Sequence, residues 1–172
     1  MGFDLPSAIG AAVAAPDRTI ICLAGDGSLQ MNIQELATLA ANKLPVKLFI
    51  LENNGYLSIR STQKNFFGKL IGEGPESGVV FPDFVQVAHA YGLSACKLDL
   101  QNPSQHIRRL LDSDQPEVVV VPLDLKQGFE PKTSSKRLPD GRIITAPLED
   151  MAPLMDREEF LSNIIIRLTE EK

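Results

Sequence analysis

The chain has 172 residues, of which 44% are hydrophobic and 23% charged, and its formal net charge is −5. This length fits one domain of ordinary size, and the composition is globular rather than disordered. The acidic balance without a long Lys/Arg block argues against a nucleic-acid partner, and no apolar run approaches the roughly 20 residues of a membrane helix.

The two cysteines give no sign of a metal or disulfide framework. Cys22 lies within an apolar run and is interpreted as a small buried hydrophobe, and neither it nor Cys96 has the Cys/His spacing of a zinc site. The N-terminal residues lack the basic start of a secretory signal. A reducing, cytoplasmic setting is therefore expected.

The first part of the chain alternates between helical and strand patterns. Residues 5–15 are small and apolar and predict a tightly packed helix. The runs TIICLA at 19–24 and VKLFILE at 46–52 are almost continuously apolar, which is typical of parallel strands buried on both faces. Between them, apolar residues at helical spacing predict a helix over 29–42.

The alternation continues after a connection over 53–82 that is rich in Gly, Ser and Asn and weakly periodic. A connection of this length usually indicates function or disorder. The following pattern predicts a helix over 82–92 with Pro82 in its first turn and Gly92 as its stop, a strand near 94–99, a helix over 103–112 and a strand over 116–123. The expected fold class is α/β, with a mostly parallel sheet sandwiched by helices.

The last part of the chain is less regular. Residues 125–150 have little periodicity and are expected to form an extended tail, followed by an amphipathic helix over about 156–170. From Lys126 to Arg142 the chain contains five basic and two acidic residues. This basic segment could cover the sheet or fold over a ligand as a lid, and the covering role is slightly favoured.

Two polar turns follow the two buried strands. Gly25-Asp26-Gly27 comes after the first strand, and Asn53-Asn54-Gly55 comes after the second. In open α/β sheets, ligands bind at the carboxyl ends of the strands. If the strands are neighbours, Asp26 and Asn53 therefore meet at one rim of the sheet.

The chemistry of these turns suits a magnesium-bound diphosphate. The Asp26 carboxylate and the Asn53 amide oxygen are hard donors of the kind that Mg²⁺ prefers, and Mg²⁺ completes its shell with water and phosphate oxygens. The glycines beside Asp26 let the backbone approach a phosphate closely. Ser28 and the start of the following helix add N–H and O–H donors.

The same residues resemble a known family. Gly-Asp-Gly followed, one helix and one strand later, by Asn-Asn is similar to the metal–diphosphate motif of thiamine diphosphate enzymes. MGFDLPSAIGAA, LATLAANKLPVKLFILENN and PDFVQVAHAYG resemble segments of the diphosphate-binding domain in the acetolactate synthase branch of that family. The resemblance covers roughly residues 1–124, and it implies that residues 1–172 form this C-terminal domain, with 125–172 as its tail and last helix.

The resemblance implies a set of cofactor and metal contacts. Asp26 and Asn53 would bind Mg²⁺ through their side chains and Gly55 through its main-chain carbonyl. The cofactor-binding positions would be the diphosphate cradle of Gly25, Gly27 and Ser28, and Met1 where the family has the apolar residue that wedges the cofactor into a bent shape. Tyr56 and Leu57 follow the metal turn and could contact cofactor or substrate.

No catalytic residue is predicted in this chain. In the family, the glutamate that activates the cofactor lies on a separate pyrimidine-binding domain, which would be supplied by the same or a partner chain. The chain is therefore expected to be a fragment or one half of a split enzyme, inactive alone, and the complete enzyme is expected to be a homodimer or other homo-oligomer.

The resemblance implies that the complete enzyme decarboxylates a 2-oxo acid such as pyruvate and joins the product to an acceptor. One alternative is a plain 2-oxo acid decarboxylase, of which this chain would be the diphosphate-binding part or subunit. A second is a non-catalytic assembly domain. The pair Asp26 and Asn53 counts against the second, because an idle site has no need of matched oxygen ligands.

Other interpretations of these residues are weaker. Gly-Asp-Gly and Asn-Asn-Gly are common turn formers when they occur alone. A GxGxxG after a strand and a Walker pattern are both absent from the sequence. His89 and His106 are interpreted as surface or half-buried residues rather than catalysts. The charged residues of the long connection are interpreted as solvated, with contact to an anionic substrate as the alternative: Arg60, Lys64 and Lys69.

Overall fold

The computed structural model describes residues 1–128, 130–137 and 139–165. These residues fall into two compact units, Met1–Lys126 and Gln127–Lys172, which are treated separately below. Among the helices of the described ranges, none is long and apolar enough to cross a membrane.

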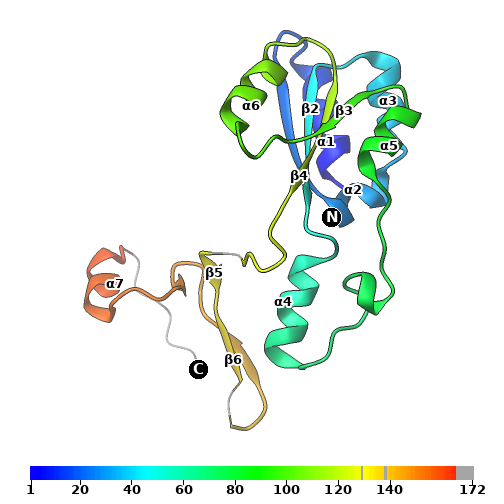
Figure 1. Cartoon of the computed structure of the whole chain (residues 1–172). Helices are drawn as coiled ribbons and strands as arrows, with labels where there is room; N and C mark the ends of the chain where they lie inside the picture. The colour runs from blue at the N-terminus through cyan, green and yellow to red at the C-terminus, as the bar shows by residue number, and fades with distance from the viewer. Residues whose placement is uncertain (129, 138, 166–172) are drawn as a thin grey trace. The chain divides into compact units, whose positions relative to one another are not determined.

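The first unit is built on a four-stranded parallel sheet (Figure 1). Its strands follow the order β1-β2-β4-β3, and every neighbouring pair is parallel. Their bounds are β1 (Ile20–Gly25), β2 (Val46–Glu52), β3 (Ser94–Lys97) and β4 (Glu117–Pro122). All four predicted strands are present, and the α/β class with a parallel sheet between helices is confirmed.

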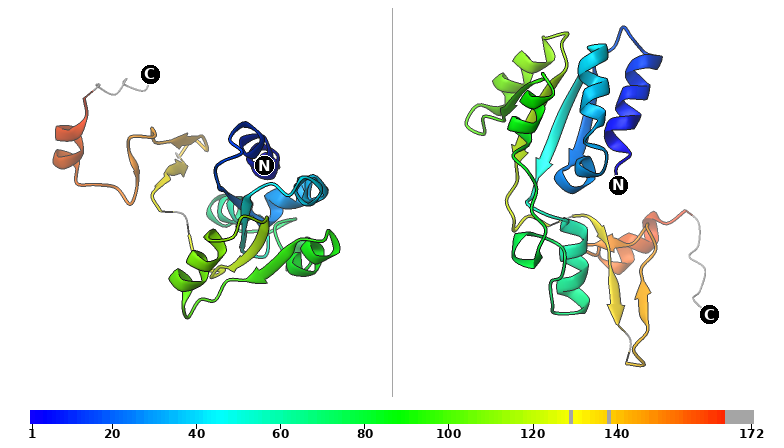
Figure 2. Two further views of the ribbon diagram at one scale, coloured as in Figure 1. Left: turned by 90° about the horizontal axis from the view of Figure 1, so that it is seen from above. Right: turned by 90° about the vertical axis from the view of Figure 1, so that its right-hand side faces the viewer.

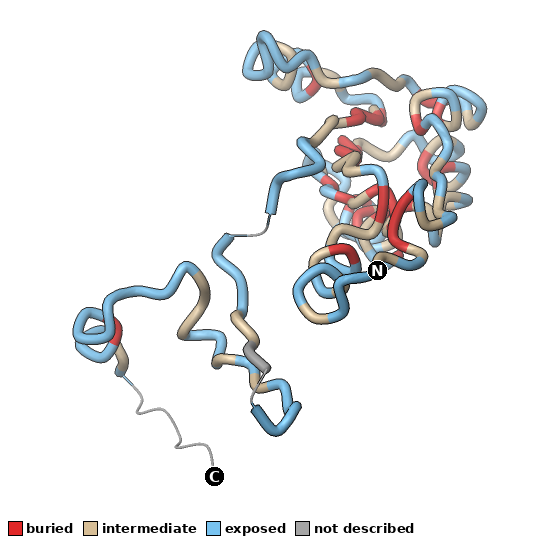
Figure 3. Tube along the Cα trace, turned by 60° about the horizontal axis from the view of Figure 1, so that its bottom comes forward, coloured by how far each residue is buried: buried red, intermediate tan, exposed pale blue. Residues whose placement is uncertain are grey.

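Helices cover the two faces of this sheet (Figure 2). On one face, α1 (Asp4–Ala14), α3 (Glu35–Asn42) and α5 (Phe84–Ala90) contribute to the main core with side chains from β1, β2 and β4. On the other face, α6 (Pro103–Leu111) packs Leu110 against Phe49 and Val119. Figure 3 shows that the buried residues concentrate in the central segments of this unit.

The expectation that both first strands are buried on both faces is correct for β2 and wrong for β1. Val46 to Ile50 are all buried, whereas β1 buries only alternate residues. Ile21 and Leu23 are 55% and 65% exposed. The difference follows from position, because β1 is at the edge of the sheet and the cluster around α6 includes side chains from β2, β3 and β4 only.

The predicted single helix over 29–42 is interrupted and begins earlier. The chain forms α2 (Asp26–Leu29), a 3-10 turn (Gln30–Asn32) and then α3. At the end of the 3-10 turn, the Asn32 side-chain amide donates to the Gly2 carbonyl at 2.5 Å. Lys43 adopts a left-handed φ of 49° and ends α3.

Two further elements differ from the sequence pattern. The connection 53–82 contains α4 (Leu57–Phe66) and a 3-10 turn (Pro75–Ser77), neither of which was predicted. The buried side chain of α4 is Arg60, so no apolar period marks this helix in the sequence. Pro82 is not in the first turn of α5: the N-cap is Asp83, whose carboxylate accepts from the next backbone N–H groups at 2.9 and 3.2 Å.

The second unit contains short elements where an extended tail was expected. β5 (Lys132–Thr133) pairs with β8 (Met151–Ala152), and β6 (Ser135–Arg137) pairs with β7 (Ile143–Thr145), both antiparallel. The predicted last helix is present as α7 (Arg157–Asn163), with Asp156 as its N-cap. The helix ends at Asn163, earlier than predicted, because Ile164 is extended, and residues 166–170 of the predicted range lie outside the described residues. The covering role of the basic segment stays a prediction.

Core packing on β2 should dominate stability. Leu48→Ala removes a fully buried side chain from the central strand and should lower the free energy of unfolding by about 2–5 kcal/mol. Leu23→Ala, the same change on the exposed face of β1, should cost no more than about 0.5 kcal/mol. Urea unfolding of both variants checks this, and equal losses would contradict the description of β1.

Candidate functional site

The two polar turns meet at the carboxyl rim of the sheet. β1 and β2 are parallel neighbours, with Gly25 opposite Leu51 in the register. Asp26 is therefore the first residue beyond β1, and Asn53 is the first beyond β2. The predicted proximity of these two residues is confirmed.

Asp26 is only 1% exposed, and its carboxylate accepts three backbone hydrogen bonds. Oδ1 accepts from the N–H of Gly27 at 2.7 Å, and Oδ2 accepts from the N–H groups of Asn53 at 3.0 Å and Gly55 at 3.3 Å. No ion pair formed by the described residues includes Asp26. A buried carboxylate without a side-chain cation favours an added positive charge.

The Asn53 side chain offers a second oxygen at this rim. Within the described ranges, its Oδ1 is buried and accepts no hydrogen bond. Buried polar atoms are almost always paired, so an unpaired amide oxygen on the residue whose N–H binds a buried carboxylate fits a hard cation such as Mg²⁺. No cluster of three or more His, Cys, Asp and Glu occurs in the described part of the chain, and the predicted ligand set contains only one such side chain.

The turn around Asn53 depends on its sequence. Asn54 has a left-handed φ of 57°, which Asn tolerates better than most residues, and Gly55 has a φ of 148°. A Cβ at Gly55 would lie 2.1 Å from the Glu73 carbonyl oxygen. Only glycine fits at this position.

The predicted diphosphate cradle is only partly open. A Cβ at Gly25 would meet nothing within 4 Å, which leaves room for a group approaching the end of β1. A Cβ at Gly27 would lie 2.5 Å from the Tyr56 ring, so this glycine accommodates an aromatic side chain. Because α2 has only four residues, the helix dipole expected beside Ser28 is small.

The N-terminal residues join the same rim. The N–H of Gly2 donates to Ser28 Oγ at 2.8 Å, which ties the start of the chain to α2. The neighbouring Met1 side chain is exposed. Its predicted contact with a cofactor stays a prediction.

Tyr56 and Leu57 follow the turn at the start of α4, where Leu57 is half-buried. The Tyr56 ring packs edge-on against Phe81, with ring centroids 5.5 Å apart. Phe81 was not among the predicted site residues. It reaches the site from the far end of the long connection, and the sequence pattern gave no sign of this contact.

Sequence analysis also missed a buried ion pair. Arg60 and Glu73 pair through Nε and Oε2, and both side chains are largely buried. The interpretation of Arg60 as a solvated charge is therefore wrong, whereas Lys64 and Lys69 are exposed as expected. Glu73 lies between two glycines in a turn-like segment, where an acidic residue is normally solvated.

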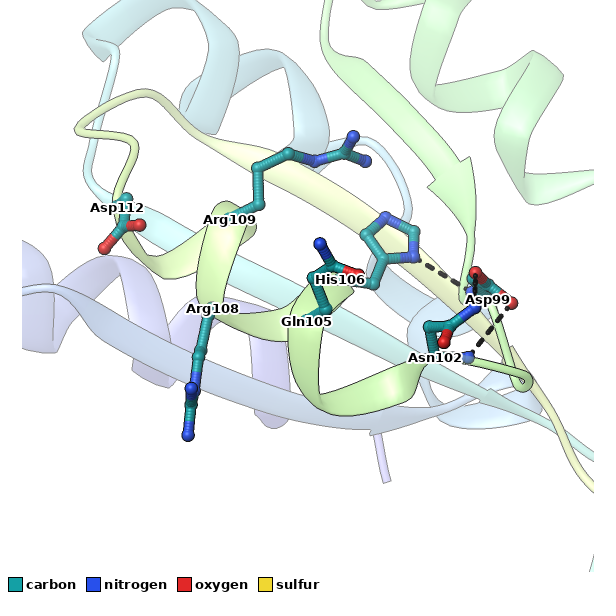
Figure 4. A pocket seen from close by; sticks show the side chains of 7 residues that line it. All are labelled: Asp99, Asn102, Gln105, His106, Arg108, Arg109 and Asp112. Carbon is teal, nitrogen blue, oxygen red and sulfur yellow. Dashed lines mark hydrogen bonds between the residues drawn. The ribbon is translucent and has the colours of Figure 1, made fainter.

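The two histidines are far along the chain from the two polar turns, and each has a hydrogen-bond partner within ten residues. His89 is exposed, and His106 Nδ1 accepts from the N–H of Asp99 at 2.9 Å. His106 belongs to an open pocket along α6 that includes none of the predicted site residues (Figure 4). The pocket is lined by Asp99, Asn102, Gln105, His106, Arg108, Arg109 and Asp112.

The interpretation of Cys22 as a small buried hydrophobe is confirmed. Cys22 is buried and free, and burial together with the nearby Asp4 charge raises the pKa of its thiol to about 11. Burial also raises the pKa of the Cys96 thiol. Thiols with raised pKa values are poor nucleophiles and poor metal ligands near neutral pH.

Substitution of Gly55 tests the geometry of the turn. Gly55→Ala places a methyl group against the backbone of Glu73 at a strained φ and should cost about 3 kcal/mol or more. Gly10→Ala, in the exposed middle of α1 with nothing within 4 Å, should instead stabilise by about 0.5–1 kcal/mol. Thermal unfolding of both variants measures the difference, and a neutral Gly55→Ala would refute the turn geometry.

Comparisons with known proteins find related sequences. Residues 1–121 match the family model "Thiamine pyrophosphate enzyme, C-terminal TPP binding domain". The chain is 36% identical over 132 residues to the acetolactate synthase isozyme 1 large subunit of Escherichia coli, covering 76% of this chain and 23% of that protein. It is 34% identical over 146 residues to a probable acetolactate synthase large subunit of Methanococcus aeolicus, covering 84% and 23%.

A solved structure is also similar. The thiamine diphosphate-dependent 4-hydroxybenzoylformate decarboxylase of Rhodococcus jostii matches with a TM-score of 0.62 and 33% identity, over 73% of this chain and 24% of that one. The chain thus spans less than a quarter of the length of the two curated relatives described above.

Proposed function

The chain belongs to the thiamine pyrophosphate enzyme family, as a C-terminal TPP-binding domain like that of acetolactate synthases. On this basis we propose that Asp26, Asn53 and Gly55 hold the Mg²⁺ of a bound thiamine diphosphate. Asp26 and Asn53 would bind the ion through their side chains, and Gly55 through its carbonyl. The group would supply carbanion chemistry at its thiazolium ring, and this chain would orient and shield it.

One observation supports the metal assignment most strongly. Asn53 Oδ1, which has no partner among the described residues, is buried at the rim where the Asp26 carboxylate is also buried, and the Asn53 N–H already donates to that carboxylate. A divalent cation would neutralise the charge and occupy the unpaired oxygen in one step. A plain turn would explain neither feature.

The diphosphate would bind beside the metal. Gly25 leaves open space at the end of β1, and the Ser28 hydroxyl, which accepts from Gly2, can still donate to a phosphate oxygen. Tyr56, Leu57 and Met1 are the remaining proposed cofactor contacts. Tyr56 and Leu57 follow the second turn along the chain, and Met1 precedes Gly2, whose N–H donates to Ser28 Oγ beside the first.

We further propose that the complete protein decarboxylates a 2-oxo acid such as pyruvate and transfers the product to an acceptor. The similarity to acetolactate synthase large subunits supports this choice. A pyrimidine-binding domain, in the same or a partner chain, would complete the cofactor pocket in a homo-oligomer. This chain alone would then be inactive, and a cytoplasmic setting is proposed for the whole.

The similarity to a decarboxylase of known structure favours a second candidate, a plain 2-oxo acid decarboxylase. The two candidates differ in the fate of the carbanion, which is transferred to an acceptor in the first and protonated in the second. Product analysis of the complete protein with pyruvate separates them. Acetolactate supports the first candidate, and acetaldehyde as the sole product supports the second.

Asp26→Ala should abolish Mg²⁺-dependent thiamine diphosphate binding, because it removes the only carboxylate in the proposed ligand set. Isothermal titration calorimetry on the complete protein, with its pyrimidine-binding domain present, measures this. Asp114→Ala, which removes an exposed acid from the loop before β4, is the matched control and should bind as the parent does.

Unchanged binding by the Asp26 variant would refute the metal assignment. If the parent protein itself binds no thiamine diphosphate in the presence of Mg²⁺, the result favours a non-catalytic assembly domain.

A further inference from the structure

The turn formed by Asn53, Asn54 and Gly55 is held between two opposite charges. On one side, the N–H groups of Asn53 and Gly55 donate to Asp26 Oδ2. On the other, the carbonyl oxygens of Asn53 and Asn54 accept from the Arg60 guanidinium at 3.3 and 3.0 Å. The peptide groups of the turn are therefore oriented by an anion and a cation at once.

Arg60 is itself fixed in place. Its Nε pairs with Glu73 Oε2, and the two side chains are only 11% and 6% exposed. Ser77 Oγ accepts from the N–H of Glu73 at 2.9 Å and from the N–H of Gly74 at 3.0 Å, which orders the segment that contains the acid. The guanidinium therefore meets the turn in one defined orientation.

The Glu73 segment also contacts the turn directly. The Glu73 carbonyl oxygen accepts from the N–H of Tyr56 at 2.7 Å. It also occupies the space that a side chain at Gly55 would need. Arg60 and Glu73 thus border the turn on the side away from Asp26.

The contacts require arginine rather than any cation. Three nitrogens of the guanidinium have three different acceptors: Nε pairs with Glu73, and the two terminal nitrogens bind the carbonyls of Asn53 and Asn54. A lysine presents a single nitrogen and cannot span these acceptors in the same geometry. A buried ion pair also stabilises a fold less than apolar packing of similar volume does. Stability alone therefore does not account for this pair.

We propose that Arg60, oriented by Glu73, is a positioning residue for the metal: it sets the turn so that Asn53 Oδ1 and the Gly55 carbonyl converge with the Asp26 carboxylate. This inference rests on the proposed function. Groups that orient metal ligands without touching the ion typically change metal affinity by about 10–100-fold when they are lost.

The test is a Mn²⁺ titration of the complete protein, with its pyrimidine-binding domain and saturating thiamine diphosphate present. Mn²⁺ binds the same hard oxygen ligands as Mg²⁺ and is counted in its free form by electron paramagnetic resonance. Arg60→Lys keeps the charge and loses the fork of donors, and it should raise the Kd for Mn²⁺ about tenfold or more. Glu73→Gln keeps an acceptor for Nε and should raise the Kd in the same direction. It tests the proposal independently if Arg60→Lys does not fold.

Lys47→Met is the matched control. Lys47 is fully buried, pairs with Glu117 at 3.1 Å and donates to the Gln115 carbonyl at 2.6 Å. It lies near the amino end of β2, at the opposite rim from the turn. This variant also breaks a buried ion pair and should lower the urea midpoint, yet its Kd for Mn²⁺ should stay that of the parent.

The outcomes separate the two claims. If the complete parent protein binds no Mn²⁺ in the presence of thiamine diphosphate, or binds it equally well after Asp26→Ala, the proposed function fails and the positioning role fails with it. If Asp26→Ala abolishes binding while Arg60→Lys and Glu73→Gln keep the parent Kd, only the positioning role is overturned. It is also overturned if Lys47→Met weakens binding as much as Arg60→Lys, because the effect is then general destabilisation.

Discussion

The buried Asp26 carboxylate is the constraint around which the rest of the site is arranged. A carboxylate taken out of water must be compensated, and here three backbone N–H groups from two different turns supply hydrogen bonds. These bonds connect the end of β1 to the residues after β2. Within the described residues, the side-chain oxygen of Asn53 in this turn accepts no hydrogen bond.

The turn after β2 is determined by contacts from both directions along the chain. Asp26 precedes it, whereas Arg60 and Glu73 follow it, and all three side chains are buried. The 3-10 turn at Pro75–Ser77 contributes to this arrangement, because Ser77 Oγ accepts from the N–H of Glu73 and orders the backbone there. A segment that looks irregular in the sequence therefore completes the rim of the sheet.

The parts of the fold that depend on local pattern could be predicted from the sequence. β2 is a continuous apolar run and is buried on both faces, and the positions of Asp26 and Asn53 just beyond two parallel strands were sufficient to bring them together. The exposure of β1 could not be predicted, since an edge strand has the same residue types as an internal one. α4 was missed because its buried residue is a charged arginine rather than one of a periodic apolar set.

Long-range pairing explains the remaining differences. The bond between Arg60 and Glu73 joins a helix to a glycine-flanked loop 13 positions later, and no repeat relates the two. Tyr56 reaches Phe81 and Gly27 in the same non-local way. Such contacts depend on how the connection folds back, which local propensity does not encode.

Anomalous diffraction from crystals of the complete protein grown with Mn²⁺ and thiamine diphosphate tests the central claim most directly. The account predicts one manganese peak bonded to an Asp26 carboxylate oxygen, the Asn53 Oδ1 and the Gly55 carbonyl. A peak bound by other residues, or occupied cofactor with no metal between the two turns, would contradict it.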